Sequence, residues 1–248
     1  MQPTYPGDKA FSDLLVEARI PMDVYTVRSF VTGFVLGPEY VPVQFAADEI
    51  LLMGTEREIK FETPQMREQF VATLSGLWNE IAELRSPLLK RVRPLPEAFV
   101  DFEYLVAYLN SLCEDAALFL GALEEAGLSL DDQSWSEERL ESSLEEIEAF
   151  LAQAEAFLDT LQKKRIRTKS DFSKLVRELC VFHDVWENSF GEITSVLKQL
   201  RQAGKSPLLV PGPNAAVPQM PRMSAPQATC SCGSGKTFRE CCMLKLVN

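Results

Sequence analysis

Four cysteines near the C-terminal end of the chain have the types and spacing of metal ligands. Cys230 and Cys232 are separated by one residue, and Cys241 and Cys242 follow after a gap of eight residues. Four thiolates suit tetrahedral zinc, and the glycines between the two pairs let the chain reverse to close the site. Such a short segment cannot bury a useful core, so the metal should supply the free energy of folding. We predict a knuckle over residues 230–248 that holds one zinc ion, with iron as the alternative metal.

The predicted metal site is structural rather than catalytic, because four protein ligands leave no coordination position open for water. The segment Gly235-Lys236-Thr237 also resembles the end of a phosphate-binding loop. The complete loop would need a glycine where Cys230 stands and a strand before it, and the sequence offers neither. Nucleotide hydrolysis is therefore not expected.

The cysteines belong to a longer recognisable pattern. It resembles the SEC-C motif, C-x-C-G-S-G-K followed by C-[CH], seen at the end of the SecA translocase motor, and the matching residues are Cys230, Cys232, Gly233, Ser234, Gly235, Lys236, Cys241 and Cys242. The resemblance implies a zinc-dependent docking module, which in SecA is associated with binding a chaperone and the ribosome. On this basis Lys236 and Arg239 are candidate contacts to a partner.

A second resemblance lies near the N-terminus. The segment 30–42 is similar to the L-x-G-x-x-x-G-P-E-x-x-P segment of the YecA-like (YgfB-related) proteins, through Gly33, Gly37, Pro38, Glu39 and Pro42. The segment 65–84, which contains Leu77-Trp78-Asn79-Glu80, resembles their next helix. These proteins are helical and often end in a SEC-C tail, so the resemblance implies a helical body.

The periodicity of the apolar residues independently predicts an all-α body. From Phe11 onward apolar residues recur at intervals of three and four, and no stretch alternates as a strand would. Prolines and glycines then divide the chain into expected helices over 9–19, 23–36, 64–86, 97–126, 134–163 and 170–203.

The last two expected helices have heptad patterns typical of a long antiparallel hairpin. The first seam contains Leu140, Leu144, Ile147, Leu151, Ala154, Leu158 and Leu161. The second contains Phe172, Val176, Leu179, His183, Trp186, Phe190, Ile193, Leu197 and Leu200. Its polar member, His183, has Asp184 beside it and Cys180 three residues before it, which is compatible with catalysis. A packed core histidine is the interpretation favoured by its place on the seam.

These patterns divide the chain into four parts. We predict a YecA-like helical domain over 1–130, the heptad hairpin over 131–204, a proline-rich linker over 205–229 and the SEC-C segment over 230–248. A proline-rich chain favours an extended conformation of about 3.1 Å per residue, so the linker could hold the knuckle up to roughly 75 Å from the hairpin.

The expected hairpin tip carries five basic residues in an otherwise acidic protein. They are Lys163, Lys164, Arg165, Arg167 and Lys169. Such a tip could contact ribosomal RNA or an acidic protein surface. The alternative is that these residues only complement the dipole of the preceding helix and keep the turn solvated.

The composition limits the classes of partner. A formal net charge of −11 argues against broad nucleic-acid binding. The sequence contains no run of eighteen apolar residues without charges, so no membrane span is expected. With no export signal, a cytoplasmic location is expected. We interpret the protein as a non-enzymatic adaptor whose knuckle docks on a protein or ribosomal partner, in protein targeting or chaperone work. The alternatives are metal handling, or an enzyme with a site in the helical body around Gly33 and Glu39.

Overall fold

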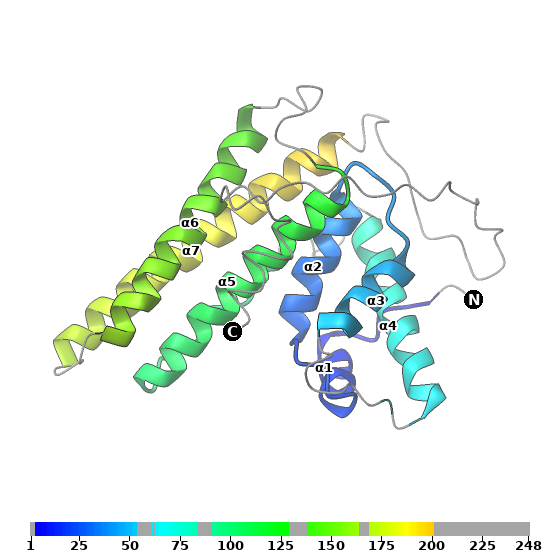
Figure 1. Cartoon of the computed structure of the whole chain (residues 1–248), viewed down its shortest axis with the longest axis horizontal. Coiled ribbons are helices and arrows are strands. Elements are labelled where there is room, and N and C mark those ends of the chain that lie inside the picture. The colour runs from blue at the N-terminus through cyan, green and yellow to red at the C-terminus, as the bar shows by residue number, and fades with distance from the viewer. Residues whose placement is uncertain are drawn as a thin grey trace.

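The computed structural model describes residues 3–53, 61, 63–83, 91–128, 138–163 and 169–200. Within these ranges the chain forms seven helices and no strand, which confirms the all-α prediction. The helices are α1 (Asp8–Glu17), α2 (Val24–Leu36), α3 (Val43–Met53), α4 (Pro64–Ala82), α5 (Phe102–Glu125), α6 (Glu138–Lys163) and α7 (Lys169–Leu200). Figure 1 shows α5 between the pair α6 and α7 on one side and the group α1 to α4 on the other.

Helix α2 lies at the centre of this arrangement. It packs on α5 along its length and also contacts α1, α3, α4 and α7. All of its residues except Tyr25 are buried, including the polar residues Thr26, Arg28, Ser29 and Thr32. A helix with this pattern has to be covered on every side, so α2 forms the axis of the core.

Gly33 of α2 and Gly37, the residue that follows this helix, set how closely α5 can approach. A Cβ added to Gly33 would lie 2.6 Å from the Phe119 carbonyl oxygen and 2.7 Å from the Cβ of Ala122. At Gly37 an added Cβ would lie 2.2 Å from the Cβ of Ala126. The backbones of α2 and α5 therefore meet at a separation that a larger residue could not fit.

Helices α6 and α7 run antiparallel along each other, as the two heptad seams predicted (Figure 1). Phe150 and Phe157 of α6 pack against the ring of Phe182 of α7. The pair also packs on α5, because the Phe119 ring of α5 contacts Trp186 and Phe190 of α7 at centroid distances of 5.8 and 4.8 Å. The hairpin and the N-terminal helices thus share one hydrophobic core.

The structure corrects two sequence expectations. Helix α3 lies where no helix is expected, because Pro42 divides the chain in the sequence interpretation, whereas in the structure it directly precedes the first helical residue. The expected helix 97–126 was wrong at its start, since Asp101 is the N-cap of α5 and accepts a hydrogen bond from the amide of Tyr104 at 2.7 Å. The residues before it, 91–100, form no helix.

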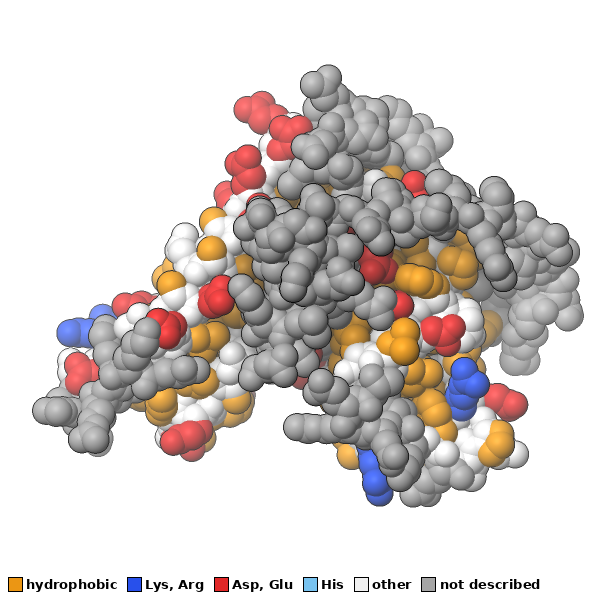
Figure 2. Space-filling view, in the orientation of Figure 1, with side chains coloured by type: hydrophobic (Ala, Val, Ile, Leu, Met, Phe, Trp, Pro, Cys, Tyr) orange, Lys and Arg blue, Asp and Glu red, His pale blue; other side chains and the backbone are white. Residues whose placement is uncertain are grey.

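Helix α5 is, among the described helices, the one long and apolar enough to cross a membrane by length and composition. More than half of its apolar window is buried inside the molecule, as in the core helix of a soluble protein. The surface is mainly acidic. Figure 2 shows Asp and Glu side chains spread over the visible face, and Lys or Arg side chains at few points. This agrees with the net charge of −11.

Candidate functional site

The predicted metal ligands Cys230, Cys232, Cys241 and Cys242 lie outside the residues that the structure describes. So do Lys236 and Arg239, the candidate partner contacts of the same segment. The geometry of the knuckle therefore stays a prediction from sequence.

The predicted basic tip lies partly outside the described residues as well. Lys163 is the last residue of α6 and Lys169 is the first residue of α7, so both stand at the ends of the helices that flank the tip. Lys164, Arg165 and Arg167 belong to the segment between these ends and fall outside the description. Whether this tip binds a partner or only keeps the turn solvated stays a prediction.

The region around Gly33 and Glu39, the alternative enzymatic site, serves to join α2 to α5. The amide of Glu39 donates a 2.8 Å hydrogen bond to the carbonyl of Ala126 at the end of α5. The Glu39 side chain lies over Gly127, where an added Cβ would be 2.5 Å from its Cγ. Gly127 has a φ of 83°, a left-handed conformation that favours glycine and ends the helix. The contacts around Gly33 and Glu39 are therefore explained by the packing of α2 and the residues after it against α5.

A partly buried ionic cluster around Arg93 was not predicted from the sequence. The Arg93 guanidinium donates two hydrogen bonds of 2.9 Å to the carboxylate of Asp115 in α5 and pairs with Asp23, the N-cap of α2. The hydroxyl of Thr26 donates to Asp115 at 2.8 Å and accepts from Arg93 at 3.1 Å. Asp115 and Thr26 are buried, so this arrangement supplies hydrogen bonds to a carboxylate that has lost its water.

The electrostatics of this Arg93 cluster reflect burial. Burial raises the pKa of Asp115 to about 6, although the guanidinium of Arg93 and the hydroxyl of Thr26 oppose the shift. Burial also opposes the charge of Arg93, but Asp115 and Asp23 outweigh it and raise the pKa of the guanidinium. The pKa of Asp23 is lowered, because its contacts with Arg93 and two backbone amides outweigh its own burial. The cluster clamps the segment before α5 onto α2.

His183 reaches the same segment from α7. Its Nε2 lies 3.0 Å from the backbone carbonyl oxygen of Arg93, and its ring packs near that of Tyr108. The side chain is buried, as expected for a seam position. Arg93 thus connects three helices, with its side chain on α2 and α5 and its carbonyl on α7.

One residue of the sequence indicates the Arg93 cluster. Asp115 is an acidic residue inside the long apolar stretch of α5, and such a residue needs a buried partner. Its partner could not be identified from spacing, because Arg93 lies 22 residues earlier in the chain, in a segment that forms no helix.

One comparison with known proteins gave a match. Residues 228–244 match the model of the SEC-C motif, a range that includes all four predicted metal ligands. The match shows a SEC-C motif in this segment and confirms that part of the sequence prediction. No curated protein and no solved structure matches the chain. The resemblance to YecA-like proteins accordingly stays a prediction.

Proposed function

We propose that this protein is a metal-binding adaptor, in which the SEC-C segment holds one zinc ion and docks on a partner while the helical body binds another. The observation that carries the proposal is the C-x-C…C-C set within the matched residues 228–244. Four thiolates are soft ligands that fit zinc in a closed tetrahedral site, and iron is the alternative. Such a site organises the chain around it and gives it a defined surface.

The helical body supports the proposal as a scaffold. Its helices share one core, and the Arg93 cluster ties the hairpin side to the N-terminal side. A rigid body joined to a second binding segment gains avidity, because the second contact forms at an effective concentration set by the linker. Ribosomes and chaperones are the partners that we propose, and the cytoplasm is the proposed location.

The first experiment measures which metal accompanies the protein and which residues hold it. The full chain, purified without added metal, is compared with a Cys241→Ser/Cys242→Ser variant by elemental analysis. We expect one equivalent of zinc bound by thiolates in the parent and its loss in the variant. Iron instead of zinc would redirect the proposal to metal handling, and a parent whose metal content equals that of the variant would refute the site.

Two control variants separate the metal site from general damage. Ser231→Ala changes a residue between two predicted ligands without removing a thiol, and Cys113→Ala removes a buried thiol of α5. Both should keep the thiolate-bound zinc.

The docking role is tested by comparing ribosome and chaperone binding of the full chain with that of a chain ending at residue 204. Equal binding by the two would count against the adaptor proposal even if zinc is present.

A further inference from the structure

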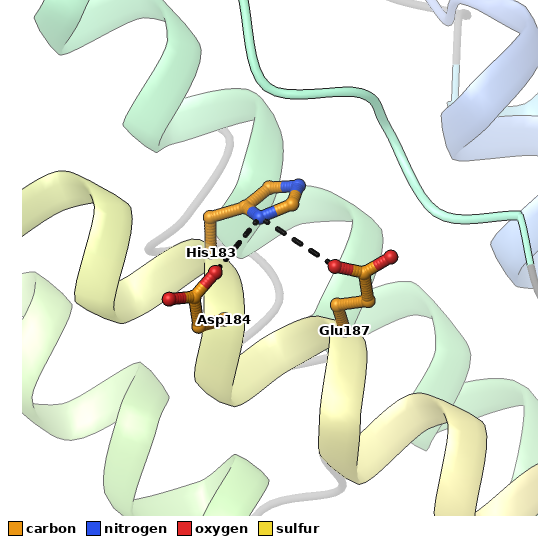
Figure 3. Close-up of side chains that lie close together, drawn as sticks. All are labelled: His183, Asp184 and Glu187. Carbon is orange, nitrogen blue, oxygen red and sulfur yellow. Dashed lines mark ion pairs between the residues drawn. The ribbon is translucent and has the colours of Figure 1, made fainter.

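Three potential metal ligands converge on one side of α7, far along the sequence from the cysteine segment. The Nδ1 atom of His183 lies 3.7 Å from a carboxylate oxygen of Asp184 and 4.0 Å from one of Glu187. One donor atom from each residue lies within 4.8 Å of the other two. Figure 3 shows both carboxylates directed toward the imidazole ring.

The hydrogen bond on the other side of the ring determines which nitrogen is available. The Arg93 carbonyl oxygen can only accept, so the Nε2 atom of His183, 3.0 Å away, must carry the proton of this bond. In the neutral imidazole the lone pair then belongs to Nδ1, the nitrogen beside the two carboxylates. Metal-binding histidines commonly donate their second ring nitrogen to a backbone carbonyl in this way, which fixes both the tautomer and the ring orientation.

The three side chains differ in exposure in a way that suits a metal site at the surface. The His183 side chain is only 8% exposed, so its ring is held in place by packing. The side chains of Asp184 and Glu187 are 68% and 55% exposed, so an ion can approach from solvent and the carboxylates can adjust to it. The distances from Nδ1 to both carboxylates exceed the usual hydrogen-bond range of about 2.7–3.2 Å.

The separations are close to those that one ion would require. Ligand distances of about 2.1 Å in a tetrahedral arrangement place donor atoms about 3.4 Å apart. The two distances from Nδ1 are slightly longer than this, and rotation of the exposed carboxylates can close the difference. One imidazole and two carboxylates suit divalent ions such as zinc and manganese, whereas calcium and magnesium favour ligand sets made of oxygen alone.

We propose that His183, Asp184 and Glu187 form a second metal site, which binds a first-row divalent transition-metal cation. The site is independent of the cysteine segment, since its donors are nitrogen and oxygen and it is built entirely on α7. Three protein ligands leave at least one coordination position open to solvent, unlike the four thiolates of the SEC-C segment. The competing explanation is an ion pair between protonated His183 and the same carboxylates, with no role for a metal.

Manganese distinguishes these explanations in the full chain, because Mn²⁺ prefers carboxylate and imidazole ligands over thiolates. His183 is the only histidine of the protein, so its ring signals in a histidine-labelled NMR spectrum need no assignment. The titration is carried out at about pH 8, because coordination of a metal requires a deprotonated imidazole. We expect substoichiometric Mn²⁺ to broaden the His183 ring signals selectively.

The decisive comparison uses two variants with the same change in charge. Asp184→Asn/Glu187→Gln removes the carboxylate ligands, whereas Glu141→Gln/Glu178→Gln neutralises two exposed glutamates elsewhere on the hairpin. The ligand variant should need at least about tenfold more Mn²⁺ for the same broadening, since even changes around metal ligands cost 10–100-fold in affinity. The control should respond as the parent does. Broadening that is absent in the parent, or equal in parent and ligand variant, would overturn the proposal.

The outcome is separable from that of the SEC-C proposal. The same titration in the Cys241→Ser/Cys242→Ser variant should give unchanged broadening of the His183 signals. A loss of Mn²⁺ binding in that variant would show that the ion sits on the cysteine segment, and this result would also overturn the second site.

Discussion

Replacing Arg93 by methionine should destabilise the protein strongly, because it leaves a buried carboxylate without its counterion. Methionine keeps much of the length and apolar character of the arginine stem, so the change mainly removes the guanidinium. The backbone carbonyl that meets His183 is retained. Asp115 is fully buried and keeps only the hydrogen bond from Thr26, whereas the half-exposed Asp23 can turn to water. Breaking a buried pair in this way costs about 3–5 kcal/mol of unfolding free energy.

The unfolding free energy lost in Arg93→Met should depend on pH, and the burial of Asp115 determines the direction of this dependence. Its pKa is raised from 3.8 to about 6, so the folded state binds this proton more readily than the unfolded state. Stability from this group is therefore lost as pH rises from about 4 to 6. Without the guanidinium, which lowers the pKa, the shift becomes larger and the loss continues above pH 6. The difference between parent and Arg93→Met should be largest at about pH 7.5 and smaller at about pH 5.

Urea denaturation followed by circular dichroism at these two pH values measures the effect. The matched variant is Arg93→Met/Asp115→Asn, in which a neutral amide can still accept the hydrogen bond from Thr26. We expect the second change to restore more than half of the lost stability, because no uncompensated charge remains. A loss below about 1 kcal/mol for Arg93→Met, or no recovery in the double variant, would refute the reasoning.

Two further predictions concern the core and the thiols. Gly33→Ala should lower the unfolding free energy by about 1–3 kcal/mol, because its methyl group would meet the backbone of α5. Gly191→Ala should instead stabilise α7 by up to about 1 kcal/mol, because an added Cβ there meets nothing within 4 Å. Thermal unfolding of both variants measures these opposite effects. In the zinc-loaded native protein a thiol reagent should react readily only with the half-buried Cys180, because burial raises the pKa of Cys113 to about 12 and the metal protects the four SEC-C thiolates. A chelator should expose those four, and immediate reaction of five thiols without chelator would contradict the metal site.

Local sequence patterns predicted much of the fold. The heptad seams predicted the pairing of α6 and α7, because apolar residues at heptad spacing give each helix one continuous face to bury. Helix α3 was missed because its eleven residues follow Pro42, and a proline is compatible with both the end of one segment and the start of a helix. The start of α5 was placed too early because the side-chain cap at Asp101 was not recognised.

Among the candidate sites, the one formed by residues close together in the sequence was predictable, and the one formed by distant segments was not. The SEC-C motif was predictable because its four cysteines and its glycines lie within thirteen residues, and the match over residues 228–244 confirms the motif. The Arg93 cluster was not, because its members come from three segments whose proximity depends on the packing of α2 against α5. His183 was correctly placed in the core, but its hydrogen bond to Arg93 follows from that same packing and could not be inferred from the heptad.

The position of α2 also has an evolutionary consequence. Substitutions on a helix face that touches only water have little effect on stability. Helix α2 has almost no such face, because it is surrounded by α1, α3, α4, α5 and α7. Its sequence, including Gly33, should therefore change slowly among related proteins. The outer face of α6 is exposed and free to change. A distant relative would be recognisable by the thirteen residues Val24–Leu36 long after the surface of its hairpin had lost all similarity.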